Sequence, residues 1–252
     1  KHKPAHDLNI VGLAGINSLD DVGNACVVDI QVSALGGSMN AVSGILLALF
    51  ARERTGQGQY VDVSLYNTAL SMEATAVSSL WGCQETGAEP FGRIAHYYNI
   101  YKTKDGKYLT VGTIEPKFWQ ELCRLIGRDD LGNRQFDFAH GEELGQALAE
   151  VFLLKTQQEW LALIDDRDFC VTPVCSLAEA LNSELTSESG MIGVRDEDIG
   201  EIKYLQPAIK LSVTPGAIDR RAPRLGEHRE EILNSLGYTV EEITRLKEDH
   251  VI

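Results

Sequence analysis

SALGGSMNAVSGILLALFARERTGQGQYVDVSL, at residues 33–65, is the stretch that decides the fold of this chain. The pair Gly36 and Gly37 predicts a tight turn, and Ser38 is a suitable N-cap for the helix after it. The run 39–51 is apolar almost all the way round, which predicts a helix buried on every side. A turn into such a helix leaves several backbone N–H groups free at one point, which makes it a candidate site for an anion or a developing oxyanion. The alternative is an ordinary turn before a core helix.

The second half of the stretch predicts the end of this helix and a strand after it. Charged residues occupy 52–54, and Gly56 suits the left-handed position after the last turn. From Tyr60 the apolar side chains recur at every second residue, which predicts a strand up to Leu65.

Glycine turns, helices and strands alternate through the rest of the chain. A second helix is expected to end near Trp81, and the turn-rich loop 82–93 is a candidate domain boundary. A hairpin is expected at 97–113 with an Asp-Gly turn at its tip. Further helices are expected at 116–126, 142–154 and 230–236 and after the capping residues Thr156, Ser176 and Thr239, with a short strand at 169–175 and weak strands within 183–204. This alternation predicts an α/β or α+β fold, with a mixed insertion between about 85 and 190.

Composition limits the partners of the chain. Its 252 residues are 44% hydrophobic, enough to bury a core, and 37 acidic against 23 basic side chains give a net charge of −14. That charge argues against nucleic acid or an anionic membrane surface as the main partner. An anionic small ligand stays open, because it needs only a local pocket of donors.

Cysteine usage and hydropathy indicate the compartment. The five cysteines, Cys26, Cys83, Cys123, Cys170 and Cys175, are odd in number and lack CxxC spacing, which predicts reduced thiols in a cytoplasmic protein and no metal site. Charge at Arg52 cuts the apolar run short of the roughly 18 residues that a membrane-spanning helix needs. Because the chain begins at Lys1 without methionine, we expect its natural beginning to lie outside this sequence.

Several short motifs succeed one another along nearly the whole chain. They are HDLNI at 6–10, GGSM at 36–39, ARERTGQGQYVDVSL at 51–65, YKTKDGKYLTVGTIEPKFW at 101–119, TPV at 172–174 and LGEHREEIL at 225–233. In order and spacing they resemble the last two thirds of a family III CoA-transferase, in the CaiB/BaiF group that includes α-methylacyl-CoA racemase.

This resemblance implies an α/β fold in which a Rossmann-like large domain, built from both chain ends, holds a smaller inserted α+β domain. It places part of the large domain at 1–84, the small domain at 85–190, and a linker with the return to the large domain at 191–252. The first strands of the large domain would then be missing. It also implies an interlocked homodimer.

The resemblance assigns roles to particular residues. His6 falls on the motif histidine of the racemase branch and Glu115 on the glutamate beside it, although from the residues alone each reads as a structural group. The family aspartate falls on Ser33 when counted back from the helix, on Ala34 with a slip of one residue, and reaches Asp29 only by a shift of four. The remaining residues assigned to the oxyanion or the substrate are Gly36, Gly37, Ser38, Asp7 and Asn9.

The resemblance implies a coenzyme A thioester as substrate, with no permanently bound cofactor. The lead hypothesis is removal and return of the α-proton of a 2-methylacyl-CoA, with His6 as base. The first alternative is CoA transfer to a carboxylic acid, which in this family passes through an aspartyl anhydride that serine or alanine cannot form. The second is an inactive relative that only binds acyl-CoA, because the aspartate is absent.

Overall fold

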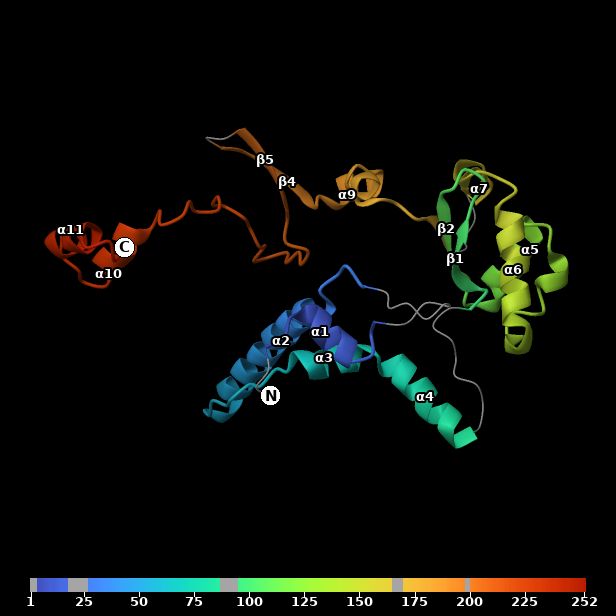
Figure 1. Cartoon of the computed structure of the whole chain (residues 1–252), viewed down its shortest axis with the longest axis horizontal. Coiled ribbons are helices and arrows are strands. Elements are labelled where there is room, and N and C mark those ends of the chain that lie inside the picture. Colours follow the sequence, from blue (N-terminus) through green and yellow to red (C-terminus); the bar gives the residue numbers. More distant parts are fainter. Residues whose placement is uncertain (1–3, 18–26, 87–94, 165–169, 198–199) are drawn as a thin grey trace.

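The computed structural model describes residues 4–17, 27–86, 95–164, 170–197 and 200–252. In Figure 1, helices α1 to α4 lie together, and strands β1 and β2 with helices α5 to α7 form a second group apart from them. The chain then runs out through a hairpin, β4 and β5, to a terminal helix pair. The first group consists of α1 (Asp7–Leu13), α2 (Val32–Thr55), α3 (Leu65–Met72) and α4 (Ala74–Thr86).

Helix α2 begins earlier than the sequence predicts and is far less buried. It starts at Val32, so Gly36, Gly37 and Ser38 lie inside it, and the predicted turn and N-cap are wrong. Its end is confirmed, because Gly56 adopts φ 72° and its N–H bonds to the carbonyl of Arg52. Only Ser33, Gly36 and Gly37 are buried, while Leu47 is 68% exposed. The prediction of a helix buried on every side is therefore wrong, because in this chain α1 and α3 cover only its small-residue face.

Within the described ranges, α2 is also long and apolar enough to cross a membrane, with 24 residues and a mean hydropathy of 1.6. The expectation that charge at Arg52 leaves too short a run is wrong, because the helix begins well before the apolar run. This finding rests on length and composition alone, and the core helix of a soluble protein or a signal sequence meets the same criteria.

The strand predicted after α2 is wrong. Residues 57–64 form no strand, and α3 begins at Leu65, where the Ser64 hydroxyl caps it by accepting from the N–H of Asn67. An isolated alternating segment has nothing to pair with, since every strand of the described residues lies beyond residue 97. The segment instead lays Val61 against Gly44 of α2.

The glycine pair of α2 is the place where α3 crosses it. A Cβ at Gly36 would lie 2.9 Å from Cγ2 of the buried Thr68, and closer still to the tip of Met72. We expect Gly36→Val to lower the free energy of unfolding by about 1–3 kcal/mol, because overpacking outweighs the gain in helix propensity. Gly145→Val in α6 is the matched control, since a Cβ there meets nothing within 4 Å. Equal denaturation midpoints for the two variants would contradict this packing.

The second group confirms the predicted hairpin and helices. Strands β1 (Tyr98–Lys102) and β2 (Tyr108–Gly112) pair antiparallel, with Gly106 at φ 78° in the turn, and β3 (Val171–Pro173) adds to the other side of β2. Helices α5 (Pro116–Leu125), α6 (Gly141–Phe152) and α7 (Gln157–Ile164) enclose a core with this sheet. The core residues include Leu109, Trp119, Leu122, Leu148, Phe152 and Trp160, each no more than 2% exposed.

The capping residues also act as predicted. The Glu159 carboxylate accepts from the N–H and hydroxyl of Thr156, and the pairs Ser176–Glu179 and Thr239–Glu242 do the same for α8 (Leu177–Leu181) and α11 (Val240–Glu248). The weak strands predicted within 183–204 are confirmed as a hairpin of β4 (Ile192–Glu197) and β5 (Gly200–Leu205), and α9 (Glu184–Ser189) comes before them. Helix α10 (Arg229–Ser235) precedes α11.

Both sheets of the described residues are antiparallel, so the chain is a mixed α and β fold and the Rossmann-like parallel sheet stays a prediction. Four cysteines are free, Cys83, Cys123, Cys170 and Cys175, and Cys26 lies outside the described residues. Burial raises the pKa of the Cys123 thiol to about 12, so this cysteine is a packing residue.

Candidate functional site

The carboxylate of Asp7 joins the start of α1 to the start of α2. Its Oδ1 accepts from the Ser33 hydroxyl at 2.5 Å and from the backbone N–H of Ala34 at 2.8 Å. Gln31, the N-cap residue of α2, makes no side-chain cap, so Asp7 supplies from another helix the acceptor that α2 needs. The helix therefore begins at Val32, six residues before the predicted cap.

Hydrogen bonds favour the ionised form of this carboxylate. The Ser33 hydroxyl lowers the pKa of Asp7 most, and the backbone amides of Ala34 and Ser33 lower it further against an opposing effect of partial burial. The N-terminal end of α2 also favours negative charge. Asp7 is half-buried, whereas Ser33 is 0% exposed and its hydroxyl proton is committed to Asp7.

His6 directly precedes Asp7 in the chain, as the N-cap of α1. It is exposed, and its backbone N–H donates to Oδ1 of Asn9 at 3.0 Å. Asn9 thus fixes the backbone of His6, and its contact with substrate stays a prediction. The structure brings His6, Asp7, Asn9, Ser33 and Ala34 together at the adjoining starts of α1 and α2.

Glu115 lies elsewhere, as the N-cap of α5. Its carboxylate is exposed and makes no side-chain cap. Within the described part of the chain, no hydrogen bond or ion pair joins it to His6, and Figure 1 shows α1 and α5 in separate groups. One copy of the chain therefore does not form the predicted pair of His6 and Glu115.

Gln135 holds the turn that carries Glu115. Its Nε2 donates to the carbonyls of Thr113 and Ile114, at 2.9 and 2.7 Å, and the residue is 4% exposed. The backbone just before Glu115 is therefore fixed from the loop 133–136. Nothing in the sequence pattern distinguishes this glutamine, because the loop has no periodicity.

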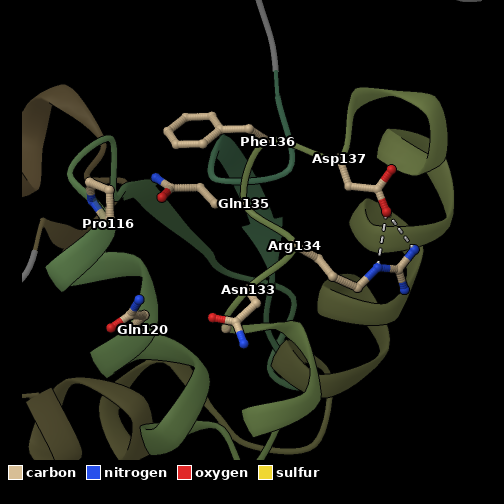
Figure 2. Close-up of a pocket in the computed structure, with 8 residues that line it drawn as sticks. Pro116, Gln120, Asn133, Arg134, Gln135, Phe136 and Asp137 are labelled. Atoms are coloured by element: carbon tan, nitrogen blue, oxygen red, sulfur yellow. Dashed lines mark hydrogen bonds and ion pairs between the residues drawn. The ribbon is translucent and has the colours of Figure 1, made fainter.

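A shallow cavity of about 550 Å³ opens at Pro116, the residue that follows Glu115 in the chain, and Figure 2 shows its lining. Its wall includes Pro116, Gln120, Asn133, Gln135 and Phe136. Arg134 is at its edge, but its guanidinium is bound by Asp137 at 2.9 Å and by Glu143 at 3.2 Å. The charge of Arg134 is thus already balanced, which makes it a poor receptor for a phosphate.

The other predicted site residues lie on or before α2. Gly36 and Gly37 contact α3, and the Ser38 hydroxyl donates to the carbonyl of Ala34. Their backbone N–H groups belong to the second turn of the helix, so a turn with free donors is absent here, and a contact with substrate stays a prediction. Asp29 is exposed before the helix. No group of three or more His, Cys, Asp or Glu that could hold a metal occurs among the described residues.

Comparison with known proteins decides the family. The model of CoA-transferase family III matches residues 1–229. The chain belongs to this family. Among its family III relatives, the α-methylacyl-CoA racemase of Homo sapiens is 33% identical over 98% of the chain, and that of Mus musculus is 34% identical over the same share. The chain spans 66% of the length of each racemase.

Two further proteins match a smaller share of the chain. The succinyl-CoA:D-citramalate CoA-transferase of Chloroflexus aurantiacus is 30% identical over 84% of this chain and 55% of its own. The solved structure of Rv3272 from Mycobacterium tuberculosis has a TM-score of 0.75 at 22% identity, covering 90% of this chain and 62% of the other. That likeness supports the fold, and the resemblance seen in the motifs is confirmed at the level of the family.

Proposed function

We propose that this family III protein moves the α-proton of a 2-methylacyl-CoA thioester, with His6 as one acid/base group. The observation that carries this choice over CoA transfer is at Ser33. Transfer in this family needs a carboxylate nucleophile at that position, and the chain has instead a hydroxyl that is fully buried and donates its proton to Asp7. Proton abstraction needs an accessible base, and the imidazole of His6 is exposed.

The chemistry requires few groups. The neutral His6 imidazole takes the α-proton, and the C–H electron pair moves into the thioester carbonyl to give an enolate. Return of a proton to the opposite face of the α-carbon inverts it, and return to the same face restores it. The proposed reaction uses no metal and no permanently bound cofactor.

We propose further that Glu115 reaches His6 from a second copy of the chain. The carboxylate is exposed and not used within its own group, and Gln135 holds its backbone in place. The apolar faces that α2 leaves uncovered are consistent with an extensive contact between copies. The site is then complete only in the dimer.

Isotope exchange tests the proposed reaction. The protein is incubated with (R)- or (S)-2-methylacyl-CoA in deuterated water, and the α-proton is followed by NMR. We expect loss of the proton signal with at least one epimer, at a rate well above that in buffer. Binding of the thioester without any exchange would contradict the proposal.

CoA transfer is the second candidate, and the 30% identity to a CoA-transferase favours it. Its signature is formation of a new thioester when a free carboxylic acid is added, together with a covalent intermediate that hydroxylamine releases. The third candidate is an inactive acyl-CoA-binding relative, which would show neither exchange nor transfer.

A further inference from the structure

The carboxylate expected on α2 is absent, and a carboxylate from α1 lies at the same place. Ser33 occupies the position that the resemblance assigns to an acid, and Oδ1 of Asp7 is 2.5 Å from its hydroxyl. We propose that Asp7 is the second acid/base group of this site. This inference rests on the proposed function.

The bonding pattern of Asp7 leaves one oxygen for this role. Oδ1 accepts from the Ser33 hydroxyl and the Ala34 N–H, and the backbone N–H of Ser33 also acts on the carboxylate, so within the described residues α2 is the element that engages Asp7 and Oδ2 is the less engaged oxygen. The residue is half-buried, so solvent or a substrate reaches it, whereas Ser33 is 0% exposed. A purely structural cap needs only the oxygen that faces α2.

The surroundings of Asp7 contain few other charges. His6 precedes it on α1, and the charged residues of α2 are at its opposite end, at 52–54. Within its bounds α3 carries Tyr66 as its ionisable side chain, and Glu73 comes directly after the helix. Hydrogen bonds and burial alone shift the pKa of Asp7, and the hydrogen bond from Ser33 is the largest effect.

The place of Asp7 beside His6 gives a balanced proton cycle. In one direction the neutral His6 imidazole takes the α-proton and a protonated Asp7 gives one to the enolate, which leaves an imidazolium and a carboxylate. In the other direction the Asp7 carboxylate takes the proton and the imidazolium returns one. His6 is the extended N-cap and Asp7 the first residue of α1, and the proposed cycle requires that the two groups act on opposite sides of one carbon.

The isosteric change Asp7→Asn separates catalysis from capping. Asn keeps an acceptor oxygen for the Ser33 hydroxyl and the Ala34 N–H, but it cannot carry a proton as an acid or base. We expect racemisation, and exchange of the epimer whose α-proton Asp7 removes, to fall by about 10²- to 10⁴-fold while the melting temperature stays within a few degrees, and the other epimer still exchanges through His6. Glu53→Gln, at the far end of α2, is the control for loss of one negative charge and is expected to exchange as the wild type does.

A second variant keeps the test decisive if Asp7→Asn folds poorly. Ser33→Ala removes the hydrogen bond that lowers the pKa of Asp7 most, so the pKa rises toward its ordinary value. A rate that needs the Asp7 carboxylate falls as pH drops through that pKa, so in Ser33→Ala the acidic limb of the kcat/KM profile moves to higher pH. A purely structural Asp7 would leave the limb where it is.

Failure of the role of Asp7 can be distinguished from failure of the proposed reaction. Unchanged racemisation and unchanged exchange of both epimers by Asp7→Asn, or an unmoved acidic limb in Ser33→Ala, overturns the role of Asp7 and leaves the reaction standing. A wild type that exchanges neither epimer overturns the proposed function and this inference with it.

Discussion

Replacing Trp119 by alanine is expected to lower the free energy of unfolding by about 3–5 kcal/mol. The side chain is 0% exposed on α5, and its Nε1–H donates to the carbonyl of Leu131 at 3.0 Å. The change removes a large apolar group from the core and leaves that carbonyl without its partner. Because whole domains are stable by only about 5–15 kcal/mol, much of the order in the group of β1–β3 and α5–α7 is lost.

Chemical denaturation followed by near-ultraviolet circular dichroism measures this effect. Leu154→Ala is the control, since Leu154 is 67% exposed and its truncation is expected to change stability by less than about 0.5 kcal/mol. Trp119→Phe keeps an aromatic ring but loses the donor to Leu131, and is expected to fall between the two. Equal midpoints for Trp119→Ala and Leu154→Ala would contradict the assignment of the core.

Local signals in the sequence predict the second group well and the first group poorly. The Asp-Gly turn at 105–106, the proline that opens α5 and the capping pair Thr156–Glu159 each determine structure within a few residues, and each is confirmed. The start of α2 depends instead on Asp7, which is 27 residues from Ala34 in sequence. Patterns among neighbouring residues cannot predict a contact between residues so far apart in sequence.

Burial of α2 failed as a prediction for a different reason. Its apolar run indicates what the helix can bury. Leu47 and Val42 are exposed because, among the described residues, the neighbours packed on α2 are α1, α3 and the segment after α2. The candidate site is likewise predicted in part. The motif predicts that His6 and Asp7 belong to one site, but no pattern shows that Ser33 donates to Asp7 or that Gln135 holds the backbone before Glu115.

For the epimer that His6 deprotonates, His6→Ala and Glu115→Gln should each abolish most α-proton exchange alone and restore it when combined in one dimer. His6→Ala removes an acid/base group, so a loss of about 10²- to 10⁴-fold is expected. Glu115→Gln removes the carboxylate proposed to orient His6, so it also lowers the rate. The two residues lie in separate groups of one chain, which makes the mixed dimer informative.

The mixed dimer is obtained by producing both variants together with two different affinity tags and purifying on each in turn. In a twofold dimer whose sites are shared between copies, one site combines the intact His6 of one chain with the intact Glu115 of the other. The second site then carries both changes. We expect about half of the wild-type exchange per dimer, far above either variant alone.

The controls are the two dimers that contain a single variant, each produced with both tags. Neither control is expected to regain α-proton exchange. A site formed within one chain would give a mixed dimer in which every site has one defect, so exchange would stay at the level of the single variants. That outcome, with the mixed dimer verified by both tags, would exclude a shared site. Recovery to about half would instead explain why an exposed Glu115, its backbone fixed through Gln135, makes no side-chain cap at the start of α5.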